Sequence, residues 1–138
     1  MDKNKLQYLP TPSTLIDRLV ICQLKEMKIP EFREEYTKEI NQILNDLNVH
    51  LKEKPTELTA ELIRHIVINA IMNNEIWHNE SNFRKGVREN NHLEKSHGIN
   101  GLRNSSMNKI QEILDPTGRK DYKIDNVEAF KELVPSTY

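Results

Sequence analysis

The sequence predicts an all-α protein, a helical bundle of four main helices followed by a short C-terminal helix. Two observations support this fold class. Apolar residues recur at helical spacing along several stretches of the chain. The 138 residues include only four glycines and six prolines, too few for a loop-rich or all-β fold. We expect one helical domain over residues 1–138, with an N-terminal arm at 1–11 and a polar loop at 84–101.

The first two helices are expected on either side of Pro30. Thr11 can cap the first helix and Pro12 suits its first position. Apolar residues then follow at 15, 16, 19, 20, 24 and 27, until Pro30 ends or bends the helix. The second helix runs to about residue 51 and has a charged opposite face. Its apolar stripe consists of Phe32, Tyr36, Ile40, Ile43, Leu44, Leu47 and Leu51.

The third helix is predicted from about Ala60, with Thr59 as its N-cap. Apolar residues cover almost its whole circumference. A helix of this kind is either central or also packs on another subunit, so we expect a homo-oligomer. The residues concerned are Leu62, Ile63, Ile66, Val67, Ile68, Ala70, Ile71, Met72 and Ile76.

The polar loop at 84–101 carries three of the four glycines. A fourth helix is expected over 102–114, ended by Pro116 and Gly118. Asp125 can cap a short last helix that reaches residue 134.

Composition excludes several classes of function. Acidic and basic residues are interspersed and sum to a net charge of −1, which argues against a global attraction to nucleic acid or to an anionic membrane. No apolar run approaches 18 residues, and the N-terminus lacks an apolar signal segment, so we expect no membrane partner and a cytoplasmic protein. Cys22 lies among apolar residues and is expected to be buried. Phosphate-loop and dinucleotide motifs are missing, and we expect no cofactor.

The third helix also carries a polar stripe. His65, Asn69, Asn73 and Trp77 are spaced by four residues, and Glu80 and Arg84 follow near the same line. Residues four apart lie on one side of a helix. Burying such polar groups without a hydrogen bond costs roughly 1–3 kcal/mol each, so each of them needs a partner.

Two interpretations of the stripe are open. In the first, Asn69 and Asn73 belong to a structural network with polar groups of the first helix, for which Gln23 and Glu26 are candidates. In the second, the stripe lines a pocket. Trp77 would then stack on a base or sugar ring and the amides would bind polar edges. Anionic groups would be bound by Arg84 with Lys85 or Arg88, and from across the loop by Arg103 with Asn104.

No metal site or catalytic motif is predicted. His78, Glu80, His92 and His97 are suitable residue types, but their spacing matches no metal-ligand pattern. General acid–base catalysis would have His65, His78 or Glu80 available. A His and a Glu on one helix are not a catalytic motif, so the sequence favours a protein without enzymatic activity.

Two stretches resemble known groups of proteins. "TPSTLIDRLVICQLK" is similar to the opening of a group of small phage proteins, and "NNEIWHNESNFR" with "INGLRNSSMNKIQEIL" resembles an uncharacterised family of short all-helical proteins. That family has a Trp-His-Glu-type helix and occurs in phages and bacterial glycan-synthesis loci. The similarity covers residues 11–29 and 62–114, and Asn79 interrupts the acidic pair that the family has after Trp-His. The resemblance implies an all-helical fold and importance of the region from Trp77 to Arg84.

A phage-like origin suggests a function by class. Phages encode small helical proteins that sequester the nucleotide signals of bacterial immunity, and such anti-defence sponges need binding groups but no catalytic set. We therefore expect sequestration of a small anionic ligand of the nucleotide type, in the host cytoplasm. The alternatives are an enzyme acting on a nucleotide-sugar or glycan, with His78 and Glu80 as its acid–base pair, and a protein-binding inhibitor or structural oligomer. The expected ligand-binding residues are His65, Asn69, Asn73, Trp77, His78, Glu80, Arg84, Arg103 and Asn104.

Overall fold

The computed structural model describes residues 9–86 and 92–118, which form four α-helices, one 3-10 turn and no strand. The all-α class with four main helices is thereby confirmed. The short helix predicted after Asp125 and most of the predicted N-terminal arm lie outside the described residues. The elements are α1 (Pro12–Lys28), η1 (Pro30–Phe32), α2 (Arg33–Glu53), α3 (Ala60–Arg84) and α4 (His92–Leu114).

The predicted N-caps of α1 and α3 are confirmed. The Thr11 hydroxyl accepts a hydrogen bond from the backbone N–H of Thr14, and Pro12 is the first residue of α1. The Thr59 hydroxyl accepts one from the N–H of Leu62. Each bond satisfies an N–H group that has no partner within the helix, so both helices begin where a threonine can cap them.

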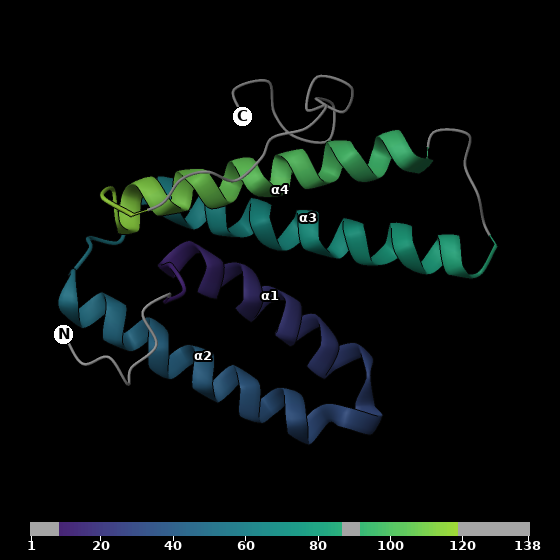
Figure 1. Ribbon diagram of the computed structural model, residues 1–138, viewed down its shortest axis with the longest axis horizontal. Helices are drawn as coiled ribbons and strands as arrows, with labels where there is room; N and C mark the ends of the chain where they lie inside the picture. The colour runs from purple at the N-terminus through teal and green to yellow at the C-terminus, as the bar shows by residue number, and fades with distance from the viewer. Residues whose placement is uncertain (1–8, 87–91, 119–138) are drawn as a thin grey trace.

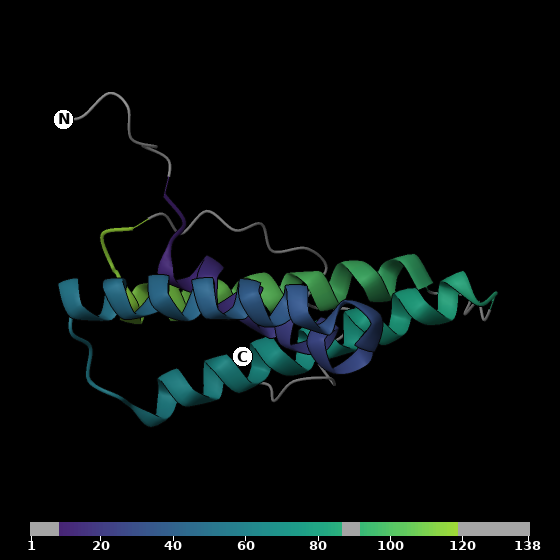
Figure 2. The same cartoon turned by 90° about the horizontal axis from the view of Figure 1, so that it is seen from below.

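The helices form two antiparallel hairpins, α1 with α2 and α3 with α4 (Figure 1). α1 lies between α2 and the second hairpin and packs against both α3 and α4. Within the described residues, the backbone of α2 comes close only to α1 and η1. Figure 2 shows that α2 and the beginning of α3 diverge, so these two helices do not pack directly on each other.

Three apolar clusters make up the core. One joins α3 to α4 around Ile99 and Leu102, and another joins α1 to α2 around Leu15 and Cys22. Cys22 is buried, as predicted. The third cluster contains Ile16, Leu62, Ile110 and Leu114, and it holds the two hairpins together at the end where α1 begins.

The predicted polar loop at 84–101 is wrong over residues 92–101, which form the first ten residues of α4. Gly98 and Gly101 are buried, on the helix that makes the most extensive contact with α3. A glycine inside a helix costs about 1 kcal/mol relative to alanine. Burial of the neighbouring Ile99 and Leu102 outweighs this cost, because each side chain is at most 1% exposed.

The predicted apolar stripe of α2 is only partly buried. Ile40 and Ile43 are in the core, whereas Phe32, Leu44 and Leu51 are 43–56% exposed. The reason is that only α1 packs along α2 among the helices of the described chain, so the part of the stripe that faces away from α1 stays exposed. No helix among the described residues is long and apolar enough to cross a membrane.

Candidate functional site

A buried ion pair lies where α1, α3 and α4 meet. Arg103 of α4 binds the Asp17 carboxylate of α1 with two groups, Nε to Oδ1 at 2.9 Å and Nη2 to Oδ2 at 2.7 Å. The side chain of Asp17 is 7% exposed and that of Arg103 is 26% exposed. Two parallel N–H···O bonds are the strongest geometry that an arginine and a carboxylate can adopt.

Two amides of α3 complete the coordination of this carboxylate. The Nδ2 groups of Asn69 and Asn73 donate to Asp17 Oδ1 at 3.2 and 2.9 Å, so that this oxygen accepts three hydrogen bonds. Asn73 also donates to Asn69 Oδ1, and Asn69 donates to the hydroxyl of Ser106 on α4. Both amides are at most 5% exposed and are bonded within the protein.

The network keeps Asp17 ionised. Burial alone would raise the pKa of this carboxyl group, but the hydrogen bonds and positive charge of Arg103, with the two amides, lower it below its ordinary value. A buried carboxylate is tolerated only when it is paired and hydrogen-bonded in this way. The arrangement therefore supports the structural interpretation of the polar stripe at Asn69 and Asn73.

The partners in the network differ from those predicted. Gln23 and Glu26 bond each other on the exposed side of α1 instead of reaching α3. Asp17 and Ser106 were missed. The available signal was an acid between the apolar pairs 15–16 and 19–20, together with an arginine that follows Leu102. An acid among apolar residues that are spaced for burial needs a partner, because a carboxylate cannot be buried alone, and Arg103 was one of the bases available.

The other predicted site residues are not brought together with the network. Each step of four residues along a helix turns by about 40°, so the stripe from His65 to Trp77 winds about 120° around α3. His65 is half-buried, and its pKa is lowered by burial and by the charges of Lys109 and Arg64. Trp77 is half-buried and, by helical spacing, lies on the side of Ala70.

The last turns of α3 are exposed. Glu80 and Arg84 form an ion pair at 3.5 Å with side chains 57% and 78% exposed, and His78 is exposed as well. Asn104 is half-buried on α4. Arg88 and the side chain of His92 lie outside the described residues. Of the nine predicted residues, the structure thus brings Asn69, Asn73 and Arg103 together in the buried network and leaves the other six apart from it. Nucleotide binding by these residues stays a prediction.

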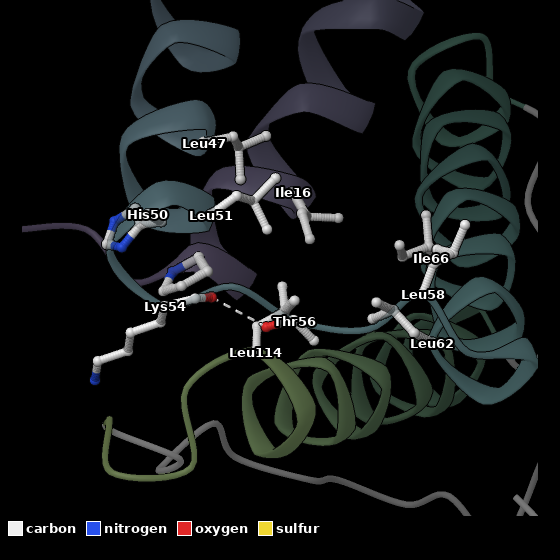
Figure 3. A pocket seen from close by; sticks show the side chains of 11 residues that line it. Ile16, Leu47, His50, Leu51, Lys54, Thr56, Leu58, Leu62, Ile66 and Leu114 are labelled. Atoms are coloured by element: carbon white, nitrogen blue, oxygen red, sulfur yellow. Dashed lines mark hydrogen bonds between the residues drawn. The ribbon is translucent and has the colours of Figure 1, made fainter.

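An apolar cavity of about 340 Å³ lies between the two hairpins, where α2 and α3 diverge. Figure 3 shows Leu47 and Leu51 of α2 on one side, Leu62 and Ile66 of α3 on the other, and Ile16 of α1 between them. Leu114, at the end of α4, lies below them. A cavity of this size and lining is within the range of binding sites in proteins.

A second, more open cavity of about 420 Å³ follows along the same helices. Ile40 and Leu44 of α2 and Ala70 of α3 line it, again with residues of α1 between them. The two cavities therefore succeed each other between α2 and α3, and we call them together the interhelical groove. Its lining residues on the walls are Ile40, Leu44, Leu47 and Leu51 of α2, Leu58 of the following loop, and Leu62, Ile66 and Ala70 of α3.

Three polar residues, His50, Lys54 and Thr56, also line the first cavity, and each has a hydrogen-bond partner within the protein. His50 Nε2 lies 3.2 Å from the backbone oxygen of Pro10, and Lys54 Nζ donates to Asp115 Oδ1 and Thr117 Oγ1. The Thr56 hydroxyl donates to the backbone oxygen of Lys54, the bond drawn in Figure 3. The groove consequently offers an occupant mainly apolar contact.

The structure and the comparisons with known proteins add two findings. Within residues 9–86 and 92–118, no three His, Cys, Asp or Glu side chains are placed so that they could hold a metal ion. The chain matches no protein-family model, and no curated protein and no solved structure matches it. Only the arrangement of the described residues therefore indicates a function.

Proposed function

We propose that this chain is a non-catalytic protein-interaction module, whose interhelical groove receives an amphipathic helix of a protein partner. One observation carries the proposal: the groove is apolar along its length and its rim exposes large aliphatic side chains. Leu44 and Leu51 are 43% and 44% exposed, and Leu58 is 73% exposed. Contiguous apolar surface of this kind marks interaction sites on proteins, because leaving it in water is unfavourable.

The shape of the groove suits a helix. Its α2 wall extends from Ile40 to Leu51, which corresponds to about 16 Å or three helical turns. Its floor is α1, and its two walls are helices whose backbones do not approach each other. An amphipathic helix binds in such a groove by placing residues spaced three and four apart against the apolar walls.

A direct test uses a fluorescein-labelled amphipathic peptide of about 14 residues, built from leucine and lysine at helical spacing so that it forms four turns. Its fluorescence anisotropy is measured while the full-length protein is added. We expect saturable binding to the wild type. Leu44→Lys should weaken binding at least tenfold, because it places a charge on the apolar wall.

Val49→Lys is the matched control. Val49 is also on α2 and is 47% exposed, but it is not among the residues that line the groove. The control adds the same charge to the same helix, so it should bind the peptide as the wild type does. Absence of binding to the wild type, or equal loss in both variants, would overturn the proposal.

A further inference from the structure

We infer that the helix that covers the groove is α3 of a second copy of this chain, in a symmetric dimer. The inference rests on the proposed function, since it names the occupant of the same groove. Its basis is an exposed apolar surface on α3, beside the groove. An occupant of the groove needs such an apolar surface.

That surface is a stripe of three residues, Ile63, Val67 and Ile71, which are 48%, 49% and 50% exposed. They are spaced by four, so they lie on one side of α3 over more than two turns. Each of them directly follows a groove-lining residue, Leu62, Ile66 or Ala70. Successive residues are about 100° apart on a helix, so the stripe borders the groove and continues its apolar surface.

The exposed area agrees with the requirement of a dimer. Six large aliphatic residues border the groove, namely Leu44, Leu51, Leu58, Ile63, Val67 and Ile71. They are exposed by about half on average, so together they present on the order of 500 Å² of apolar surface to water. A standard interface buries about 800 Å² per partner, and about 65% of a homodimer interface is apolar, which again gives roughly 500 Å².

The stripe is also self-complementary. When two α3 helices lie antiparallel with Val67 at the twofold axis, Ile63 of one copy faces Ile71 of the other, and the reverse. Each α3 then covers the mouth of the other copy's groove, near Leu44 and Leu51. Such an isologous contact closes on itself, so assembly stops at a dimer. This arrangement accounts for a helix that is apolar on nearly all sides.

The test is the mass of the full-length protein in solution, measured by sedimentation velocity from about 1 to 100 µM, the weak end of the range for interfaces of this size. We expect a dimer. Val67→Glu places two carboxylates opposite each other at the axis and should weaken association at least about 100-fold. Val49→Glu adds the same charge away from the groove and should leave the dimer intact. Circular dichroism should show equal helix content in the three proteins.

Two outcomes overturn the dimer: a monomer throughout this range, or a dimer that Val67→Glu does not weaken. The peptide experiment separates this failure from that of the proposed function. If the protein is a monomer and its peptide binding still depends on Leu44, the groove binds a helix, as proposed, but the second copy is not its occupant. If the dimer forms as inferred, the peptide and the second copy compete, so saturation of the peptide should require a higher total concentration of the wild type than it would without dimerisation.

Discussion

Asp17 of α1 and Arg103 of α4 are 86 residues apart in sequence and form a two-bond ion pair between the two hairpins. The Asp17 side chain is buried, and its carboxylate also accepts hydrogen bonds from the amides of Asn69 and Asn73. The contribution of the intact pair to stability differs from the cost of removing one of its partners. An intact pair adds little beyond what an apolar contact would give, but removal of one partner leaves an uncompensated charge in the interior.

Arg103→Met should therefore destabilise the protein by about 3 kcal/mol or more, measured as the free energy of unfolding in urea. The double variant Asp17→Leu/Arg103→Met should be more stable than Arg103→Met, because no unpaired charge remains. Arg18→Met is the control, since Arg18 pairs with Glu39 at 3.1 Å with a side chain 65% exposed. An exposed pair of this kind contributes at most about 1 kcal/mol. Equal losses in Arg103→Met and Arg18→Met would contradict a buried network.

The same carboxylate predicts a dependence of stability on pH. The pKa of Asp17 is lowered in the folded state from its ordinary value of 3.8, so the unfolded chain binds this proton more readily. The stabilisation is fully present above pH 3.8 and is lost as the pH falls from there through the lowered pKa. Urea titrations at neutral pH and across this acidic window should show a smaller acid-induced loss for Asp17→Asn than for the wild type. An identical loss would show that the proton is taken up elsewhere.

Two substitutions of Thr59 test the contribution of the N-cap of α3 to stability. Thr59→Ala removes the hydroxyl that accepts from the N–H of Leu62 and should cost about 1 kcal/mol of stability. Thr59→Ser keeps the hydroxyl and should stay close to the wild type. Thermal unfolding of the three proteins checks the expectation, and equal melting temperatures for Ala and Ser would contradict it.

The contact between α3 and α4 is tested by a core substitution. Leu102 is 1% exposed on the face of α4 that packs against Ile68 and Met72, so Leu102→Ala should lose about 2–5 kcal/mol. Leu93 is on the same helix and 65% exposed, and Leu93→Ala should change stability by less than about 0.5 kcal/mol.

The nucleotide-type ligand predicted from the sequence has its own experiment. Calorimetry with nucleotides on the wild type and on Trp77→Ala measures whether the indole stacks on a base. Stacking contributes about 1–3 kcal/mol per base, so the prediction requires roughly tenfold or greater loss in the variant. No heat of binding in either protein would exclude this ligand and leave the groove as the candidate site.

Much of the fold was predictable because it depends on local rules. Thr11, Thr59 and Pro30 fix helix ends through hydrogen bonds and sterics within a few residues. The start of α4 was not predictable in this way, since Gly98 and Gly101 oppose a helix locally and only contact with α3 makes one favourable. The sequence analysis located the polar network on α3, but the network joins residues 37 to 86 positions apart, a separation that periodicity does not encode.

The groove was visible in the sequence only as an excess of apolar residues on the second and third helices. Leu44, Leu51, Val67 and Ile71 fit a buried stripe as well as an exposed one. Their exposure depends on the divergence of α2 from α3, which follows from how α1 sits between the hairpins.

The position of the Asp17 carboxylate also limits how α1 can slide. A slip of α1 by one helical turn moves Asp17 about 5.4 Å along its axis. That displacement would break both bonds to Arg103 and both amide bonds from α3 at once, while the surrounding aliphatic contacts would merely exchange neighbours. Leucine and isoleucine tolerate many alignments, whereas the four hydrogen bonds that Asp17 accepts from three residues form in one alignment only, so a single acidic residue sets the registry of three helices.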